Sequence, residues 1–140
     1  MSIKILPMQP QHYPQVYNLW CEIEGMDLNP TDDSPAAIAT FLAANPELNY
    51  IALIKGEIVG TIMCGFDGRR ATLYHVAVAA AYQKQGIASA LLSRLEQILR
   101  QKGISKGRLL AFKSNEAATE FWQKSGWILQ NKLNYFSKCL

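Results

Sequence analysis

Residues 72–99 read TLYHVAVAAAYQKQGIASALLSRLEQIL, and this stretch decides the fold. Its first part, 72–78, is mostly apolar with β-branched and aromatic side chains, which predicts a buried strand. From residue 87 onward apolar side chains recur at helical spacing and share one face; they are Ile87, Leu91, Leu92, Leu95, Ile98 and Leu99. A strand, a turn containing Gly86 and a long amphipathic helix are therefore expected in direct succession.

The turn between them, Gln83-Lys84-Gln85-Gly86-Ile87-Ala88, is typical of a phosphate-binding helix start. The first N–H groups of a helix lack intrahelical partners, and the macrodipole places partial positive charge there. Gly86 lets the backbone approach a pyrophosphate closely, Ala88 keeps the next turn small, and Lys84 adds a mobile charge. The turn matches neither G-x-G-x-x-G nor G-x-x-x-x-G-K-[ST]. A plain helix start with a glycine near its cap stays open as the alternative.

The rest of the chain supplies elements that surround this unit. We expect a strand at 2–6, a helix at 8–24 ended by Gly25, a helix from Ser34-Pro35 to about 44, strands at 50–54 and 58–64 joined by a turn at Lys55-Gly56, a strand at 108–112, a helix at 115–124, and two short strands around Trp127 and Tyr135. The order βααβββαβαββ predicts one α+β domain over residues 1–140. Its mixed central sheet should have about six to seven strands, with about four helices packed on both faces.

Composition and length fit one cytoplasmic domain. Hydrophobic residues make up 49% of the 140 residues and charged ones 18%, enough apolar surface for one core. The N-terminus lacks the pattern of a signal peptide, and the most apolar stretch, 71–82, is too short to span a bilayer. Cys21, Cys64 and Cys139 are an odd number without metal-ligand spacing. We therefore expect free thiols in a reducing cytosol and no metal site.

The net charge of +3 is unevenly distributed along the chain. Residues 1–83 hold four Lys/Arg and eight Asp/Glu, a charge of −4, whereas 84–140 hold ten Lys/Arg and three Asp/Glu, a charge of +7. A basic half suits a polyanion or a ligand with several phosphates, and an acidic half suits a cationic substrate. Two ordinary solvated faces remain the alternative.

Two spaced motifs resemble the GNAT superfamily of acetyl-CoA-dependent N-acyltransferases. After a strand ending in Val76-Ala77-Val78, the turn fits the family's Q-x-x-G-x-A motif. Residues 115–127, NEAATEFWQKSGW, are similar to the family's N-x-x-A-x-x-F-Y-x-x-x-G-F segment. Leu19-Trp20 and residues 56–61, GEIVGT, agree as well. The resemblance covers nearly the whole chain, and the short bacterial YpeA type looks most similar.

The resemblance implies an acetyl-CoA site where the central strand splays from its neighbour at a bulge. In the family, exposed backbone groups there contact the pantetheine arm and the acetyl carbonyl, and the matching positions here are Val76, Ala77 and Val78. A backbone N–H at these positions, with Val78 as the catalytic one, would stabilise the developing oxyanion. The pyrophosphate is expected on the N–H groups of Lys84, Gln85, Gly86, Ile87, Ala88 and Ser89. Asn115 matches an Asn that hydrogen-bonds the cofactor arm, and a helix N-cap is its other ordinary role.

The chain departs from the family pattern at several positions. Gln83, still expected at the cofactor, replaces the motif's first Arg, and Ala80 replaces a Pro. Trp122 stands where a Tyr usually protonates the leaving thiolate; its indole N–H donates a hydrogen bond but is no proton source near neutral pH. We expect Trp122 to pack against the cofactor. The strand at 108–112 lacks the glutamate that serves as base in some relatives.

Candidates for the proton acceptor and the acceptor site lie near the same strand. Because residues alternate faces along a strand, Tyr74 and His75 should point oppositely, and only one should face the substrate. Tyr74 is favoured as catalytic because the YpeA type also carries Tyr there. His75 has the better unperturbed pKa, but a His packed on the other face of the sheet is the alternative. Asp67 and Arg69 are expected to bind substrate, with a solvated turn as the alternative.

A set of acidic side chains surrounds the first helix and the loop after it, which in the family covers the acceptor; the set is Glu22, Glu24, Asp27, Asp32 and Asp33. Glu24 is the one we assign to substrate binding, because such carboxylates would attract a cationic amine. An ordinary solvated surface explains them equally well.

The sequence thus predicts an N-acetyltransferase that passes the acetyl group of acetyl-CoA to a primary amine by direct attack. The expected partner is an amine acceptor, either a small molecule or a protein amine, without nucleic acid or membrane, and a homodimer stays open. A nonenzymatic acetyl-CoA sensor is the first alternative, because Trp122 and the missing glutamate weaken the catalytic set. A nucleic-acid binder using the basic half is the second, although the chain lacks zinc ligands, an aromatic RNA-binding motif and a helix-turn-helix pattern.

Overall fold

The computed structural model describes residues 2–140, which form two units, 2–110 and 111–140. The first unit contains β1 (Lys4–Pro7), α1 (Tyr13–Glu22), α2 (Pro35–Ala44), β2 (Tyr50–Ile54), β3 (Glu57–Phe66), β4 (Ala71–Val78), α3 (Ile87–Gln101) and β5 (Gly107–Leu109). Short 3-10 turns at Pro10–His12 and Ala80–Tyr82 precede α1 and α3. The second unit contains α4 (Glu116–Lys124). The α+β class and the four helices agree with the sequence analysis.

The five strands form one sheet in the order β1-β2-β3-β4-β5. The first four pair antiparallel, and β5 pairs parallel to β4, so the sheet is mixed as expected. The β2–β3 turn at Lys55-Gly56 has φ values of 52° and 77°. Positive φ at both central residues matches the twist of the flanking strands, which is why this dipeptide makes a tight hairpin.

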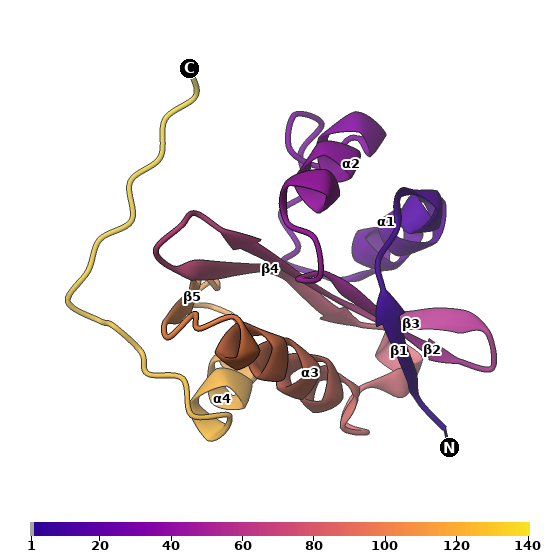
Figure 1. Ribbon diagram of the computed structural model, residues 1–140. Coiled ribbons are helices and arrows are strands. Elements are labelled where there is room, and N and C mark those ends of the chain that lie inside the picture. Colours follow the sequence, from indigo (N-terminus) through magenta and orange to yellow (C-terminus); the bar gives the residue numbers. More distant parts are fainter. Residues whose placement is uncertain (1) are drawn as a thin grey trace. The chain divides into compact units, whose positions relative to one another are not determined.

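Helices cover both faces of the sheet in the first unit (Figure 1). On one face, α1 and α2 contribute Val16, Leu19, Trp20, Ile38 and Leu42 to a buried cluster with Ile51, Ile58, Met63 and Ala77. On the other face, α3 buries Ile87, Leu91, Leu92, Leu95 and Leu99, the side chains that its sequence periodicity selects. The core therefore lies on either side of β3 and β4, the two strands that hold the candidate site.

The helix starts follow from local chemistry. Ser34 Oγ accepts a hydrogen bond from the Ala37 N–H at 3.1 Å, with Pro35 in the first helical position, as the sequence predicts. The first helix is shorter than the expected 8–24, because a 3-10 turn begins at Pro10 and α1 has Pro14 in its first turn. A proline in a helix interior would lack its hydrogen bond and clash with the preceding turn, so the helix cannot start earlier.

The number of strands is lower than predicted. The strand expected at 108–112 ends at Leu109, and residues 127–140 form no strand in the described part of the second unit. A strand requires a hydrogen-bonded neighbour, and hydrophobic character alone does not supply one. Ile128, Tyr135 and Phe136 are accordingly exposed rather than paired in a sheet. No helix within residues 2–140 is long and apolar enough to cross a membrane.

The three cysteines differ in environment, and this predicts their reactivity. Cys21 and Cys139 are exposed, whereas Cys64 is buried in β3, and burial raises its pKa from 9.0 to about 12. Because the thiolate is the reactive form, we expect two thiols to react with a maleimide in the native protein and the third only after unfolding. Above about pH 9 the unfolded chain alone loses the Cys64 proton, so this residue lowers stability as the pH rises from 9 toward 12. Mass spectrometry after labelling checks the count; a third label in native protein would contradict it.

Candidate functional site

A bulge interrupts β4 at His75 and Val76. In the register with β3, Ala77 lies opposite Thr61 and Tyr74 lies opposite Met63, so two β4 residues face the single residue Ile62. His75 has a φ of 46°, in the left-handed region that non-glycine residues rarely adopt. Such a bulge redirects the side chains and backbone groups around it, and bulges are common beside functional sites.

Beyond the bulge, one edge of β4 carries no partner strand. The β5 strand pairs with β4 only from Ala71 to Leu73, so 74–78 are unpaired on that side within residues 2–140. This is the splay that the family resemblance implies. The Ala79 N–H donates to the Val59 carbonyl at 2.8 Å, so the backbone groups of Ala79 point toward β3. Since neighbouring residues alternate in direction, the backbone groups of Val78 point away from β3, toward the unpaired edge.

The loop after β4 leads backbone N–H groups to the start of α3. Lys84 and Gly86 have φ values of 62° and 85°, so both adopt the left-handed conformation that curves the loop. The first helical bond runs from the Ala90 N–H to the Gly86 carbonyl at 3.0 Å. Within the described residues, the N–H groups of 84–89 donate no backbone or side-chain hydrogen bond. A Cβ built on Gly86 meets no atom within 4 Å, so the space before this helix is open.

Two glutamine side chains shape this loop. Gln83 Nε2 donates to the Val78 carbonyl at 3.0 Å, and Gln85 Nε2 donates to the Ala81 carbonyl at 3.5 Å. Gln83, expected at the cofactor, thus also closes the loop on the strand.

Tyr74 and His75 lie on the same face of the sheet, and the expectation that they point oppositely is wrong. The Tyr74 ring meets Phe41 of α2 edge to face at 5.7 Å, and the His75 ring lies 4.6 Å from Trp20 of α1. The bulge inserts one extra residue into β4, which interrupts the regular alternation of side-chain directions. Both side chains therefore face α1 and α2. Tyr74 is half-exposed, and His75 is mostly buried. The expected packing of His75 on the other face is also wrong.

His75 binds Asp33, a residue from the loop between α1 and α2. His75 Nε2 and Asp33 Oδ1 are 2.6 Å apart, and the Asp33 side chain is buried. Asp33 Oδ2 accepts a hydrogen bond from the Asn29 N–H at 3.0 Å. Of the acidic side chains that could attract a cationic amine, Asp33 is therefore already engaged, while Glu22, Glu24, Asp27 and Asp32 are exposed. No spacing in the sequence links Asp33 to His75, because 42 residues separate them.

The Asp67–Arg70 turn is organised by its own backbone. Asp67 Oδ1 accepts hydrogen bonds from the N–H groups of Arg69 and Arg70 at 2.7 and 2.8 Å. The Arg70 and Arg69 N–H groups hold the pKa of the Asp67 carboxyl below its ordinary value. This carboxylate shapes an exposed turn, which is the structural alternative that the sequence left open for Asp67 and Arg69.

Asn115 and Trp122 belong to the second unit, described here by itself. Asn115 Oδ1 accepts a hydrogen bond from the Ala118 N–H at 3.0 Å, so the helix N-cap role is confirmed. Trp122 lies between two aromatic rings, at 5.0 Å from Phe121 and 5.3 Å from Trp127. The contacts of Asn115 and Trp122 with a cofactor remain predictions.

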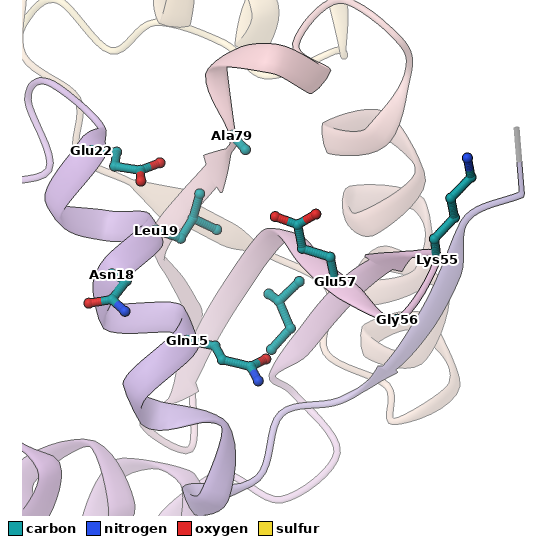
Figure 2. A pocket seen from close by; sticks show the side chains of 9 residues that line it. Gln15, Asn18, Leu19, Glu22, Lys55, Gly56, Glu57 and Ala79 are labelled. Carbon is teal, nitrogen blue, oxygen red and sulfur yellow. The ribbon is translucent and has the colours of Figure 1, made fainter.

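A pocket of about 450 Å³ lies between α1 and the β2–β3 turn (Figure 2). Figure 2 shows Glu22 on α1 and Glu57 on the hairpin, with Ala79 at the end of β4 nearby. None of the predicted cofactor positions lines this pocket. Among residues 2–140, no group of three His, Cys, Asp or Glu side chains is arranged to hold a metal ion.

Comparisons with known proteins show which family the chain is related to. The sequence profile of the Acetyltransferase (GNAT) family matches residues 13–127. An acetyltransferase of Sodalis glossinidius (strain morsitans) is 34% identical over 130 residues, which cover 91% of this chain and 89% of that protein. An uncharacterized N-acetyltransferase of Yersinia pestis is 33% identical over 135 residues, covering 95% and 92%.

A solved structure shares the fold. The PaiA N-acetyltransferase from Thermoplasma acidophilum, in complex with coenzyme A, superposes with a TM-score of 0.81 at 18% identity, over 89% of each chain. The family profile spans most of the chain, and the relatives above 30% identity are named acetyltransferases. The chain therefore belongs to the Acetyltransferase (GNAT) family and is an acyltransferase.

Proposed function

We propose that the chain transfers the acetyl group of acetyl-CoA to a primary amine by direct attack. The observation that supports this most is the unpaired edge of β4, which leads into a loop of free backbone N–H groups at the start of α3. The edge offers hydrogen bonds to the pantetheine arm and thioester, and the helix start offers them to the pyrophosphate. Family members use acetyl-CoA, and the bound coenzyme A of the Thermoplasma acidophilum relative supports the same cofactor here.

The residues present fit this cofactor by charge and by space. Residues 84–89 present consecutive free N–H groups, and the first turn of α3 contains no acidic side chain that would repel phosphate. Ser89 and Lys84 are exposed, so both can reach a ligand at this end of the helix. We assign the pyrophosphate to the N–H groups of 84–89 and the thioester to the edge at Val76 and Val78. The N–H of Ala77 points toward β3, so its contribution is smaller.

In the reaction, the neutral amine forms a new N–C bond with the acetyl carbon, and the C–S bond breaks. The amine proton passes to a base or to water, and the thiolate of coenzyme A takes a proton from solvent. A thiol has an ordinary pKa of about 8.5, so the thiolate can leave without an acid. Trp122 then needs only to pack, while Tyr74, half-exposed on the α1 and α2 face, is the candidate to contact the amine.

A calorimetric titration followed by an amine screen tests the proposal. Coenzyme A should bind and raise the melting temperature, because a ligand that binds only the native state stabilises it. Acetyl transfer to amino acids, polyamines, drugs, peptide N-termini and lysine side chains should then be measured with a thiol-release assay. We expect at least one class to be acetylated. Absence of heat and of a thermal shift at millimolar coenzyme A would refute the proposal, and binding without transfer to any amine would indicate a sensor.

A further inference from the structure

A chain of buried hydrogen bonds runs beneath the bulge from α1 through β3 to β4. Trp20 Nε1 donates to Thr61 Oγ1 at 3.0 Å, and Thr61 Oγ1 donates to the His75 carbonyl at 2.8 Å. Trp20 and Thr61 are fully buried. The Thr61 hydroxyl has one proton. Because its oxygen accepts the Trp20 indole N–H, its own proton is free to be donated to the His75 carbonyl. The position of the His75 carbonyl oxygen is thereby fixed from the β3 side.

Fixing this carbonyl also aims the next N–H group. A peptide unit is planar, and every peptide bond among the described residues is trans, so the His75 C=O and the Val76 N–H point in opposite directions. Since Thr61 on β3 holds the oxygen, the Val76 N–H points away from β3. That direction is the unpaired edge of β4, where the thioester is proposed to lie.

The His75 side chain continues the network to the loop between α1 and α2. Its ring lies 4.6 Å from the Trp20 ring, and its Nε2 binds the buried carboxylate of Asp33 at 2.6 Å. Asp33 is itself held through its backbone, because its carbonyl accepts the Tyr13 hydroxyl proton at 2.5 Å. The loop 23–34 is thus tied to the strand whose edge carries the reaction.

We propose that four residues, Trp20, Thr61, His75 and Asp33, form a bulge network that positions the Val76 N–H as the hydrogen-bond donor to the thioester oxygen. This assigns the donor to Val76 rather than to Val78, the position expected from the sequence. The same network ties the acceptor loop 23–34 to that donor. This inference rests on the proposed function. The four are positioning residues, because they act on the reaction through the peptide between His75 and Val76. The buried carboxylate and the left-handed backbone at His75 have a purpose in this arrangement, whereas a regular strand would need neither.

Thr61 offers the sharpest test. Thr61→Val removes the hydroxyl proton at nearly unchanged volume, and Thr61→Ser retains it. Loss of one oxyanion donor costs about 10²–10³-fold in kcat, so misaiming the donor should lower kcat roughly 10- to 100-fold. The dissociation constant for acetyl-CoA should change by less than about threefold, because the pyrophosphate contacts lie elsewhere. Thr61→Ser should restore most of kcat. Full kcat in folded Thr61→Val would overturn the proposal.

A second measurement does not depend on activity. The chain has only two histidines, His12 and His75, so their imidazole NMR signals are readily assigned. The N–H signal of His75 should be protected from exchange in the parent and lost in Asp33→Ala. Acetyl-CoA should shift the His75 signal and leave that of His12, which lies outside the network, in place.

These readouts separate the two proposals. A parent protein that does not bind coenzyme A overturns the proposed function and this inference together. A parent that binds and transfers, but whose His75 signal does not move on binding, overturns only the inference. His75→Gln, whose amide can still reach Asp33, should retain more kcat than His75→Ala, and His12→Gln serves as the matched control without effect on kcat. Equal losses for His75→Gln and His75→Ala would contradict the network.

Discussion

Gly86→Glu should weaken coenzyme A binding at least about 100-fold, a loss of about 2.7 kcal/mol of binding free energy. The glutamate would stand at the cap of α3, where the N–H groups of the first turn are free and where the pyrophosphate is proposed to bind. It would repel the phosphates and occupy the open space beside the glycine. Folding should survive, because a carboxylate at a helix N-terminus interacts favourably with the macrodipole, and this offsets part of the strain at a φ of 85°.

The other end of the same helix provides a matched control. Gly103 also has a positive φ, 75°, and a Cβ built there also meets no atom within 4 Å. Gly103→Glu therefore introduces the same charge and similar backbone strain, about 1–2 kcal/mol, far from the proposed phosphate site. Calorimetric titration of both variants should show the loss for Gly86 alone. If Gly86→Glu binds coenzyme A as tightly as the parent, the phosphate site lies elsewhere.

The sequence predicts the cofactor side of the fold well. The strand, turn and helix quoted from residues 72–99 appear as β4 and α3 with nearly the expected bounds, because their signals are local: apolar character, a glycine and a 3.6-residue period. The caps at Ser34 and Asn115 are local in the same way. Motif spacing is also enough to identify the family.

The acceptor side could not be predicted to the same extent. Strand alternation assigns Tyr74 and His75 to opposite faces, and only the bulge, which inserts one residue, brings them to one face. The buried Asp33 binds His75, and this tertiary contact leaves no periodic signal in the sequence. The prediction of strands around Trp127 and Tyr135 was wrong for a related reason, because apolar character does not specify a pairing partner.

Gly60 in β3 allows α3 to lie close to the sheet. A Cβ on Gly60 would lie 3.1 Å from Ile87 Cγ2, 3.2 Å from Leu91 Cδ1 and 3.3 Å from the Ala77 carbonyl oxygen. Ile87 is the first residue of α3, so a larger side chain here pushes the phosphate-binding end of the helix away from β4. Gly60→Val should destabilise the fold by about 1–3 kcal/mol through overpacking. It should also weaken coenzyme A binding about tenfold. The start of α3 and the edge of β4 are proposed to bind two parts of the same ligand, so a change in their spacing weakens the binding of both.

A substitution at Gly65 is the matched control, because an added side chain there is similarly crowded but on the opposite face of the sheet. Its Cβ would lie 3.1 Å from two atoms of the Phe41 ring, which in turn packs against Tyr74. Gly65→Val should therefore lower the melting temperature by a similar amount, but leave coenzyme A affinity within about threefold and raise KM for the amine instead. Thermal unfolding, calorimetry and steady-state kinetics on both variants distinguish the two faces. Equal losses of coenzyme A affinity would mean that both substitutions act through global stability, and that the approach of α3 to β3 does not set the geometry of the phosphate site.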